Sequence, residues 1–393
     1  MDPIHNPYSP GAGSPPPELA GRDRLREDVR IAIARIRIGN PSKSVLMVGL
    51  RGVGKTVLLD RMRQDAEESG VLALRIEAPE NRSLPALLAP QIRQVLLRLS
   101  SVEAAKDFAR KALRALAGFA KLKLKYGDIE VGLDLEPEPG LADNGDLEVD
   151  LTALLHEVGV AARSAETAVV LFIDELQYVD KAQFAALISA LHRCAQEKLP
   201  LTLVGAGLPQ LRGLAGNAKS YAERLFDYPM IGALTPSEAE VAIVKPARDA
   251  GVTFDLDAVT EIVNATRGYP YFLQEWGKRA WDVATQSPIT LADVKTASIE
   301  AVAALDESFF RVRFDRLTPT EKKYLRAMAE LGAGPQRSGD IAQALSKPVN
   351  SLAPVRASLI KKGMIWSQSH GDNEFTVPLF DEFMKRIMPD PEA

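Results

Sequence analysis

Short apolar runs alternate with helix-like stretches through the first half of the chain. The predicted strands are residues 44–48, 71–76, 168–173 and 199–204. The predicted helices are residues 25–36, 55–68, 84–99 and 181–197. Continuous apolar runs of this length indicate strands covered on both faces, whereas apolar positions three and four residues apart indicate helices. This alternation predicts an α/β fold, in which a parallel sheet carries helices on both faces.

The second half of the chain predicts helices and few strands. Helix-like patterns cover residues 236–249, 256–266 and 272–284. Three further helices and two short strands then follow, at residues 319–331, 338–345, 350–362, 364–366 and 374–377. That last order is typical of a winged helix-turn-helix. We therefore expect an α/β core over residues 18–232, an α-helical lid over 233–315 and a winged helix-turn-helix domain over 316–393.

Two segments depart from these patterns. Residues 1–17 hold six prolines and almost no large apolar side chain, which predicts a disordered tail. Residues 100–150 interrupt the strand–helix alternation, with a basic first part and an acidic second part. Alternation of period two on both sides of Gly127-Asp128 predicts a charged hairpin, so we treat 100–150 as an insertion. It is either a solvated edge element or a protein-contact element that serves assembly.

The composition excludes several classes of protein. With 46% hydrophobic and 25% charged residues, the 393-residue chain is typical of folded globular proteins. The net charge of −4 excludes a global basic field for nucleic acid but leaves a local basic patch open. The single cysteine, Cys194, excludes a disulfide framework and a multi-cysteine metal site. Neither a signal-peptide pattern nor a membrane-length apolar run is found, so we expect a cytoplasmic protein with no membrane partner.

The segment Gly49–Thr56 matches the phosphate-binding pattern G-x-x-x-x-G-K-[ST], between a predicted strand and a predicted helix. Glycines let backbone N–H groups close on phosphate oxygens, and the helix N-terminus adds partial positive charge. Lys55 would reach the β- and γ-phosphates, and Thr56 would offer its hydroxyl to Mg²⁺. The expected nucleotide contacts are Gly49, Leu50, Arg51, Gly52, Val53, Gly54, Lys55, Thr56 and Val57.

Two carboxylates follow the apolar strand 168–173 directly. Ligands of open α/β sheets bind at the carboxyl ends of the strands, which is where Asp174 and Glu175 stand. Asp174 would hold Mg²⁺, and Glu175 would orient and deprotonate an attacking water. The pair favours hydrolysis of ATP to ADP and phosphate over small-molecule phosphorylation. We therefore expect a P-loop NTPase with ATP and Mg²⁺ as cofactors.

The complete set of motifs resembles the AAA+/STAND branch of P-loop ATPases, close to the archaeal origin-recognition initiators and related bacterial ATPases. The resemblance spans roughly residues 18–388. Its parts are Leu19-Ala20-Gly21-Arg22, the loop Gly49–Thr56, the pair Asp174-Glu175, the segment 221–226, Gly268-Tyr269-Pro270 and the winged-helix pattern.

The resemblance implies further site residues. Ala20, Gly21 and Arg22 would line the adenine, and Pro270 would contact the nucleotide from the lid. Arg224 would be the arginine that reaches the γ-phosphate held by a neighbouring subunit, which implies a nucleotide-dependent homo-oligomer. Each has a structural alternative: a turn with a helix cap at 20–22, a helix-starting turn at Pro270, and a helix-end ion pair at Arg224.

The fourth strand departs from the family pattern. Such strands normally end in a polar sensor residue near the γ-phosphate, but this one ends in Gly205-Ala206-Gly207. No side chain there can hydrogen-bond a water or a phosphate. We therefore expect slow hydrolysis, as a nucleotide-state switch requires.

The predicted third helix of the C-terminal domain has the character of a DNA-contacting helix. It carries no acidic residue, and its candidate contacts are Asn350, Ser351, Arg356, Lys361 and Lys362. Double-stranded DNA would therefore bind residues 338–377. The domain is only mildly basic, so a role in protein contact or autoinhibition stays open.

Three functions fit the sequence. The first is a weakly hydrolysing ATP-dependent switch of the AAA+/STAND type, whose output domain engages DNA or a protein partner. The second is an initiator or regulator in which ATP sets DNA affinity. The third is a scaffold that assembles on ATP.

Overall fold

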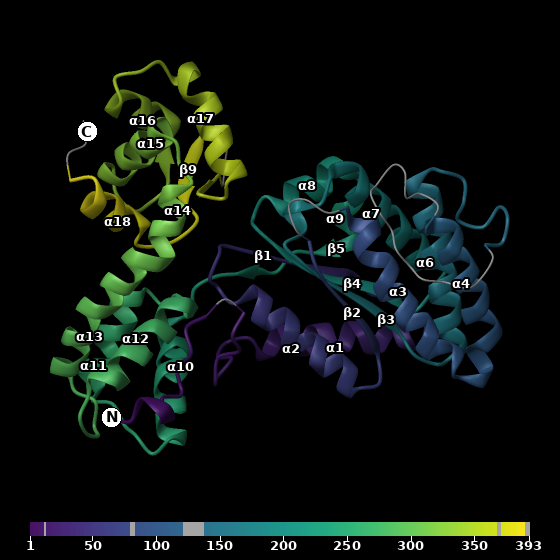
Figure 1. Ribbon diagram of the computed structural model, residues 1–393, viewed down its shortest axis with the longest axis horizontal. Helices are drawn as coiled ribbons and strands as arrows, with labels where there is room; N and C mark the ends of the chain where they lie inside the picture. The colour runs from purple at the N-terminus through teal and green to yellow at the C-terminus, as the bar shows by residue number, and fades with distance from the viewer. Residues whose placement is uncertain (12, 79–82, 121–136, 368–370, 390–393) are drawn as a thin grey trace. The chain divides into compact units, whose positions relative to one another are not determined.

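The computed structural model describes residues 1–393 except 12, 79–82, 121–136, 368–370 and 390–393 (Figure 1). The chain divides into two compact units. The first, here called the α/β unit, comprises residues 22–49 and 55–231. The second, here called the helical unit, comprises residues 1–21, 50–54 and 232–393. The expected lid and the expected C-terminal domain both fall within the helical unit.

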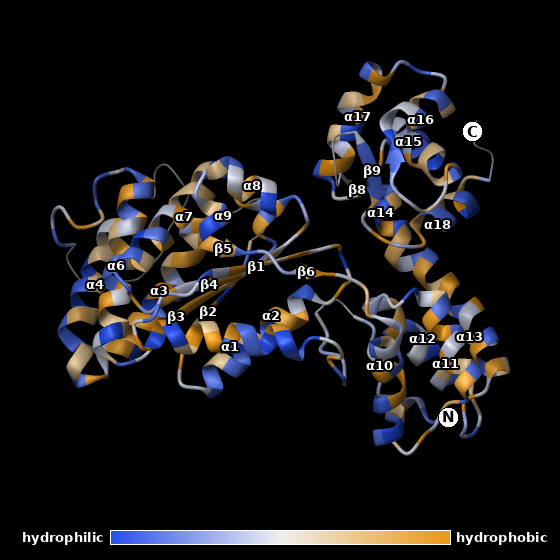
Figure 2. Ribbon diagram, turned by 180° about the vertical axis from the view of Figure 1, so that it is seen from behind, coloured by the Kyte–Doolittle hydropathy of each residue, from blue (hydrophilic) through white to orange (hydrophobic). Residues whose placement is uncertain are grey.

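The α/β unit is built on a parallel sheet. Its strands are β1 (Ser44–Gly49), β2 (Leu72–Glu77), β3 (Val169–Asp174), β4 (Leu201–Gly207), β5 (Phe226–Asp227) and β6 (Met230–Ile231). Their order is β2-β3-β4-β1-β5, with β6 also paired to β1. Every residue of β1, β3 and β4 is buried, and Figure 2 shows these strands mainly in the colours of hydrophobic residues. The predicted parallel α/β fold is confirmed.

Helices cover both faces of this sheet (Figure 1). They are α1 (Asp23–Arg37), α2 (Lys55–Glu68), α3 (Leu84–Ser100), α4 (Lys106–Phe119), α6 (Leu147–Ser164), α7 (Lys181–Gln196), α8 (Leu211–Ala218) and α9 (Ala222–Leu225). No helix within the described residues is long and apolar enough to cross a membrane.

The segment 100–150 is more than an insertion. Its first part forms α4, and α6 begins at Leu147. Leu113, Leu116 and Phe119 of α4 belong to the same buried core as the sheet. The prediction missed this because it followed the charge of the segment, whereas the apolar side chains of α4 pack on α3 and α6. The predicted charged hairpin lies outside the described residues.

The helical unit begins with the expected lid helices. They are α10 (Pro236–Asp249), α11 (Leu256–Thr266), α12 (Pro270–Val283) and α13 (Leu291–Ala304), followed by a π-helical turn (Leu305–Phe310) and α14 (Arg311–Asp315). Capping boxes start two of them, Thr235 with Glu238 at α10 and Thr290 with Asp293 at α13.

The C-terminal module follows the predicted element order. It consists of α15 (Pro319–Glu330), β7 (Gln336–Arg337), α16 (Ser338–Ala344), α17 (Val349–Lys361), β8 (Ile365–Trp366), β9 (Asp372–Phe375) and α18 (Phe380–Ile387). The strands form an antiparallel sheet in the order β7-β9-β8. Beyond the prediction, the structure adds β7 and α18. The assignment as a winged helix-turn-helix stays a prediction.

The N-terminal segment is ordered against the lid, so the prediction of a disordered tail is wrong for its first residues. Tyr8 is buried, and its hydroxyl donates to the backbone oxygen of Ile243 on α10. The Asn6 amide donates to the Lys278 oxygen at 3.1 Å and to Asp282 Oδ1 at 2.8 Å, both on α12. Proline-rich composition argues against self-contained structure, but it does not prevent single side chains from anchoring the segment elsewhere.

A buried carboxylate joins two helices of the C-terminal module. Glu321 of α15 accepts hydrogen bonds from Lys362 Nζ and from Ser358 Oγ of α17, both at 2.7 Å. Its side chain also closes the capping box with Thr318. Burial alone raises the pKa of Glu321, but these donors outweigh burial and lower the pKa to about 2.

Lys362→Ala should therefore destabilise the protein, whereas Lys361→Ala should not. The first change removes a donor from a buried carboxylate, for an expected loss of about 1–2 kcal/mol in the free energy of unfolding. Lys361 is exposed and serves as the matched control, with an expected change within about 0.5 kcal/mol. Urea and thermal melts of the two variants measure the difference.

The pH dependence of this difference follows from the pKa of Glu321. The folded-state pKa of about 2 lies below the ordinary 4.5, so the stabilisation is fully present above pH 4.5. It is lost as the pH falls toward 2. The difference in the free energy of unfolding between wild type and Lys362→Ala should therefore become smaller as the pH falls from 4.5 toward 2. Equal melting of the two single variants at pH 7 would contradict the assigned role of Lys362.

Candidate functional site

The phosphate-binding motif occupies the connection between β1 and α2. Gly52 and Gly54 have φ values of +81° and +88°, the left-handed region that side chains with a Cβ rarely adopt. A Cβ at Gly54 would meet nothing within 4 Å, so glycine is needed there for the backbone angle and not for space. At Gly52, a Cβ would also lie 2.9 Å from the Tyr269 ring.

The helix after the loop begins with the last two residues of the motif. Lys55 and Thr56 are the first two residues of α2, and Val57 follows them. Lys55 is buried although it carries a charge. The first N–H groups of an α-helix lack partners within the helix and attract anions. Glycines with left-handed φ values, a helix start and a buried lysine together fit the phosphates of a nucleotide.

The second half of the motif stands at the end of β3. Asp174 is almost fully buried, and its Oδ1 accepts the backbone N–H of Glu175 at 2.9 Å. Arg75 of β2 brings Nη2 to 3.9 Å from Asp174 Oδ2. Glu175 has φ +54°, a left-handed value that is unfavourable for a residue with a Cβ. The hydroxyl of Thr56 and the carboxylate of Asp174 are oxygen donors of the kind that Mg²⁺ prefers.

The end of β4 is crowded by side chains that follow Glu175. A Cβ at Gly205 would collide with Leu176 Cδ1, and a Cβ at Gly207 would lie 2.7 Å from Gln177 Oε1. Gln177 Oε1 accepts the N–H of Leu208 at 3.0 Å, while its Nε2 donates to Glu175. The sequence analysis noted Gly205 and Gly207 but did not identify the side chains that require glycine there. The sequence does contain one of them, Gln177, two positions after Glu175.

The loop also contacts the lid within the helical unit. Gly52 O accepts the N–H of Tyr271 at 3.2 Å, at the start of α12. Pro270 is the first residue of that helix, where proline is favoured. Its predicted contact with nucleotide stays a prediction.

An arginine pair lies beside the loop. A Cβ at Gly363, in the turn after α17, would lie 3.0 Å from Arg51 Nη2. Arg313 of α14 stacks on Phe309, with Cζ 3.9 Å from the ring centroid. Burial, and then the charge of Arg51, lower the pKa of Arg313 to about 10. Sequence reasoning missed Arg313, because nothing in its local pattern shows that the phosphate-loop arginine lies near it.

The segment predicted to line the adenine connects the two units. Ala20 is buried, and Gly21 has φ +70°. A Cβ at Gly21 would lie 2.5 Å from the Glu238 carboxylate, so glycine allows close approach to α10. Arg22 is the N-cap of α1 and makes no side-chain cap. The structure thus gives Gly21 and Arg22 turn and capping positions, and their contact with a base stays a prediction.

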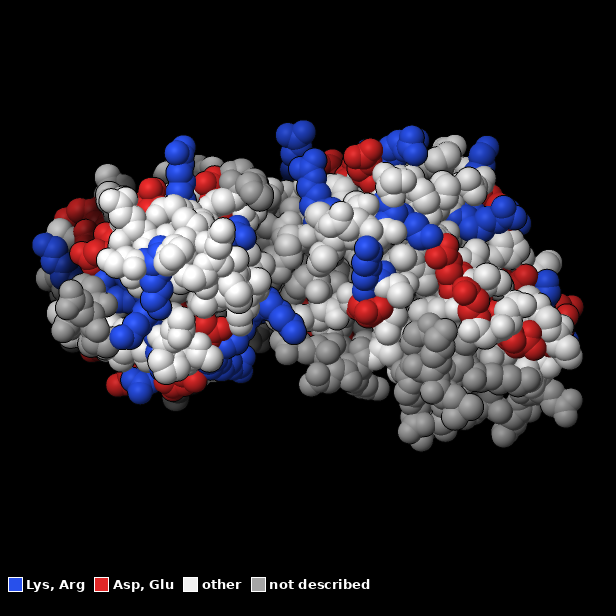
Figure 3. All heavy atoms as spheres, turned by 90° about the horizontal axis from the view of Figure 1, so that it is seen from above, with Lys and Arg blue, Asp and Glu red and all other residues white. Residues whose placement is uncertain are grey.

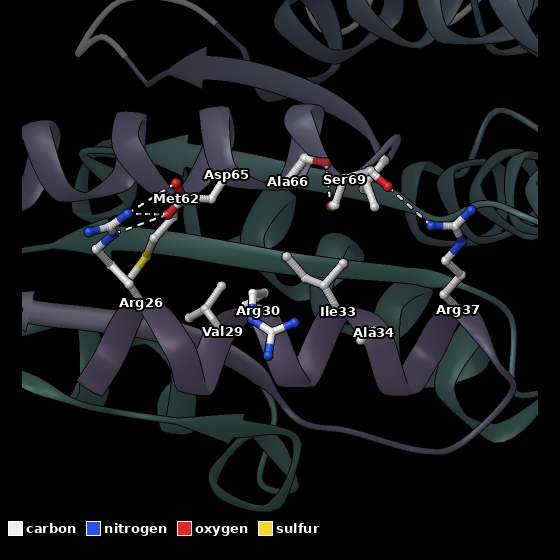
Figure 4. Close-up of a pocket in the computed structure, with 11 residues that line it drawn as sticks. Arg26, Val29, Arg30, Ile33, Ala34, Arg37, Met62, Asp65, Ala66 and Ser69 are labelled. Carbon is white, nitrogen blue, oxygen red and sulfur yellow. Dashed lines mark hydrogen bonds and ion pairs between the residues drawn. The ribbon is translucent and has the colours of Figure 1, made fainter. Parts of the chain in front are cut away.

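An arginine–aspartate pair fixes α1 against the phosphate-loop helix α2. Arg26 donates from Nε to Asp65 Oδ2 at 3.0 Å and from Nη2 to Asp65 Oδ1 at 3.1 Å (Figure 4). At the other end of α1, Arg37 Nη1 donates to the Ser69 oxygen at 3.1 Å. A pocket between these two contacts is lined by Val29, Ile33 and other side chains of the two helices. The pocket lies along the two helices, and Lys55 is not among the residues that line it. We therefore treat it as a gap in helix packing and not as part of the candidate site.

Arg224 lies exposed on α9. Within the described part of the chain it makes no ion pair, and Asp227, an acidic residue two positions after α9, pairs with Lys43 at 3.0 Å. The alternative role of Arg224, as one partner of a helix-end ion pair, is therefore not seen among the described residues.

The candidate DNA-contacting residues divide into two groups. Arg356 is held inside the module, with Nε donating to Asn373 Oδ1 at 2.6 Å and Nη2 donating to Ser367 Oγ at 2.9 Å. Lys362 is bound to Glu321. Both cations already have partners inside the module, and their contact with DNA stays a prediction. The exposed candidates are Asn350, Ser351 and Lys361.

Comparison with known proteins supports the ATPase interpretation. Residues 18–204 match the AAA ATPase domain model, and residues 307–384 match a domain of unknown function. A Methanocaldococcus jannaschii protein, named an uncharacterized HTH-type transcriptional regulator, is 23% identical over 339 residues, covering 84% of this chain and 79% of that protein.

Solved structures are similar over nearly the whole chain. The Walker-type ATPase of Pyrococcus abyssi is 16% identical with a TM-score of 0.56, covering 93% of this chain and 96% of that one. The Orc1 protein of Aeropyrum pernix, solved in complex with DNA, is 16% identical with a TM-score of 0.47, covering 94% of each chain. The P. abyssi structure confirms the fold. The AAA ATPase match includes both halves of the phosphate-binding motif, so residues 18–204 are similar to an AAA ATPase domain that contains the candidate site.

Proposed function

We propose that this protein binds ATP with Mg²⁺, hydrolyses it slowly and uses the bound nucleotide as a switch whose output passes through the C-terminal module, in the cytoplasm. The observation that carries the proposal is the buried Lys55 at the start of α2, directly after two glycines with left-handed φ values. Glycines of this kind let backbone N–H groups close on phosphate oxygens, and the helix start and the Lys55 ammonium group add positive charge at the same place.

Each residue of the site has a separate role in this proposal. Lys55 and the loop N–H groups bind phosphate oxygens. Thr56 and Asp174 would hold Mg²⁺, which neutralises phosphate charge when bound. Glu175 orients the attacking water and accepts its proton. Turnover is slow because no polar side chain extends from the end of β4.

The switch has a physical route from the loop to the C-terminal module. Arg51 belongs to the phosphate-binding loop, and its guanidinium packs against Gly363 in the turn after α17. A loop that closes on phosphate would change the position of this guanidinium. This contact supports nucleotide-dependent output through the module.

Lys55→Ala should abolish tight ATP binding, because it removes the charge that faces the phosphates. Lys43→Ala is the matched control, since Lys43 is an exposed lysine paired with Asp227 just before β1. Isothermal titration with Mg-ATP measures both. Wild-type affinity in Lys55→Ala would exclude the loop as the phosphate site.

Glu175→Gln should retain ATP and lose turnover. The amide keeps the size of the side chain but cannot accept the proton of water, so phosphate release should fall by about 10²–10⁴-fold. Glu68→Gln, on the exposed end of α2, is the control and should be unaffected. Unchanged phosphate release in Glu175→Gln would remove Glu175 from the mechanism.

Arg224 is proposed as an arginine supplied to the nucleotide of a neighbouring subunit in a nucleotide-dependent homo-oligomer. Its exposure and the absence of an ion pair among the described residues leave it available. A planar guanidinium bridges two phosphate oxygens better than an ammonium group does. Supply from a neighbour would couple hydrolysis to assembly.

The ATPase rate per molecule should then rise with protein concentration. Arg224→Ala should lower turnover and leave ATP affinity unchanged, whereas the exposed Arg248→Ala should change neither. Mixing Arg224→Ala with Lys55→Ala should restore activity, because the first subunit holds ATP and the second supplies Arg224. A rate independent of concentration, with Arg224→Ala fully active, would refute the proposal.

DNA binding is a second candidate output, favoured by the exposed Lys361, Asn350 and Ser351 on α17 and by the name of the M. jannaschii relative. The surface limits its strength. On the face shown in Figure 3, basic and acidic side chains are interspersed. Few phosphate contacts give weak, salt-sensitive binding.

Lys361→Ala should weaken binding to double-stranded DNA and reduce the salt slope by about one. Asn350→Ala should instead change sequence preference if it reads a base edge. Fluorescence anisotropy at low salt, with ATP and with ADP, measures both. Absence of wild-type binding under both conditions would assign the module to protein contact. A mass increase on adding a non-hydrolysed ATP analogue, measured by light scattering, together with an absence of ATP turnover, would favour the scaffold function.

A further inference from the structure

We propose that Gln177 is a positioning residue for hydrolysis: it holds the carboxylate of Glu175 and links it to the end of β4, where the sensor side chain is missing. The proposal rests on the proposed ATPase function and deepens it. Its basis is a bridge in which the Gln177 amide donates from Nε2 to Glu175 Oε2 and accepts at Oε1 from the Leu208 N–H at 3.0 Å.

The bridge fixes which way the amide points. A backbone N–H can only donate, so the Gln177 atom beside Leu208 must be the oxygen. The NH₂ group therefore faces Glu175, whose carboxylate can accept its hydrogen bond. A donor held at one carboxylate oxygen restricts rotation of Glu175 and leaves its second oxygen for a proton from water. Gln177 thus acts through Glu175 and does not touch the reacting atoms.

The glycine at the sensor position gives this arrangement its space. A Cβ at Gly207 would lie 2.7 Å from Gln177 Oε1 and 2.9 Å from Leu211 Cδ2. Any larger residue at 207 would displace the amide oxygen from Leu208. The missing sensor and the glutamine bridge are therefore one feature, in which a side chain from the end of β3 occupies the space where β4 would otherwise place its own.

The backbone of Glu175 explains why such a hold is needed. Glu175 has φ +54° between the end of β3 and the 3₁₀ turn Leu176–Tyr178. A residue in this conformation is kept there by its surroundings. Leu176, which packs on Gly205, holds the turn on one side, and Gln177 holds it on the other. The position of the Glu175 carboxylate therefore depends on contacts with β4.

Two substitutions separate positioning from support of the turn. Gln177→Glu keeps the oxygen that accepts the Leu208 N–H, but it cannot donate to Glu175 and adds a like charge beside it. Gln177→Ala removes both contacts. If Gln177 only supported the turn, kcat would follow the melting temperature and the protection of the Leu208 amide, so Gln177→Glu would keep more of the wild-type kcat than Gln177→Ala. If it positions Glu175, both variants should lower kcat by about 10-fold or more and leave ATP affinity unchanged.

The test measures phosphate release, ATP affinity by calorimetry, melting temperature and hydrogen exchange at the Leu208 amide. Leu208 exchange should be fast in Gln177→Ala and slow in Gln177→Glu, which checks the bridge without using activity. In the Glu175→Gln background, neither change at 177 should lower residual turnover further, because the group it acts on is already lost.

The outcomes distinguish this proposal from the proposed function. Wild type that binds ATP without hydrolysing it would remove hydrolysis from the function, and this proposal with it. Wild type that turns over, is slowed by Glu175→Gln and is unaffected by Gln177→Glu would overturn the role of Gln177 alone. Additive loss in the double variants, or unchanged Leu208 exchange in Gln177→Ala, would also overturn it.

Discussion

The register of the parallel sheet is the constraint on which the site depends. In β1–β4 pairing, Val48 lies opposite Gly207, and in β2–β3 pairing, Glu77 lies opposite Asp174. Because the strands are parallel and in this register, their carboxyl ends meet at one edge. The start of the phosphate-binding loop, the acidic pair and the glycines of β4 follow these ends. Shifting any one strand by a residue would separate groups that must act together and would turn its side chains to the opposite face.

Crowding at that edge decides which residues the strand ends can carry. Asp174 is enclosed and fixed by the Glu175 N–H, whereas Glu175 leaves the strand through a left-handed backbone angle. The side chains of Leu176 and Gln177, in the turn that follows, fill the space above β4. Only glycine at 205 and 207 leaves room for these two side chains. A side chain at 207 would compete for this space with the Gln177 amide, whose Oε1 would lie 2.7 Å from its Cβ. The chain thus replaces a side chain from one strand with a side chain from its neighbour.

Features that repeat with a regular period or match a motif were predictable from the sequence, and features made by single distant contacts were not. The four longer strands and the loop Gly49–Thr56 follow from apolar runs and from glycine spacing, which are local properties. The hydrogen bond from Tyr8 to the backbone oxygen of Ile243 joins segments far apart in the chain, and no periodic pattern in the sequence predicts it. The same holds for Arg356 with Asn373. A basic side chain on a helix has the same sequence signal whether it faces DNA or a neighbouring strand.

Continuity of the aromatic core explains why the lid and the C-terminal module form one compact unit. The Phe310 ring, at the end of the π-helical turn, lies 5.7 Å from the Phe380 ring and 5.3 Å from the Phe383 ring, measured between centroids. Phe272 of α12 contacts Phe310 from the lid side, at 6.2 Å. Separating the lid from the module would expose Phe310, which costs about 1.5–3 kcal/mol for its burial alone. The lid and the module therefore share one aromatic core, and the approach of Arg51 to Gly363 places the phosphate-binding loop against the same unit.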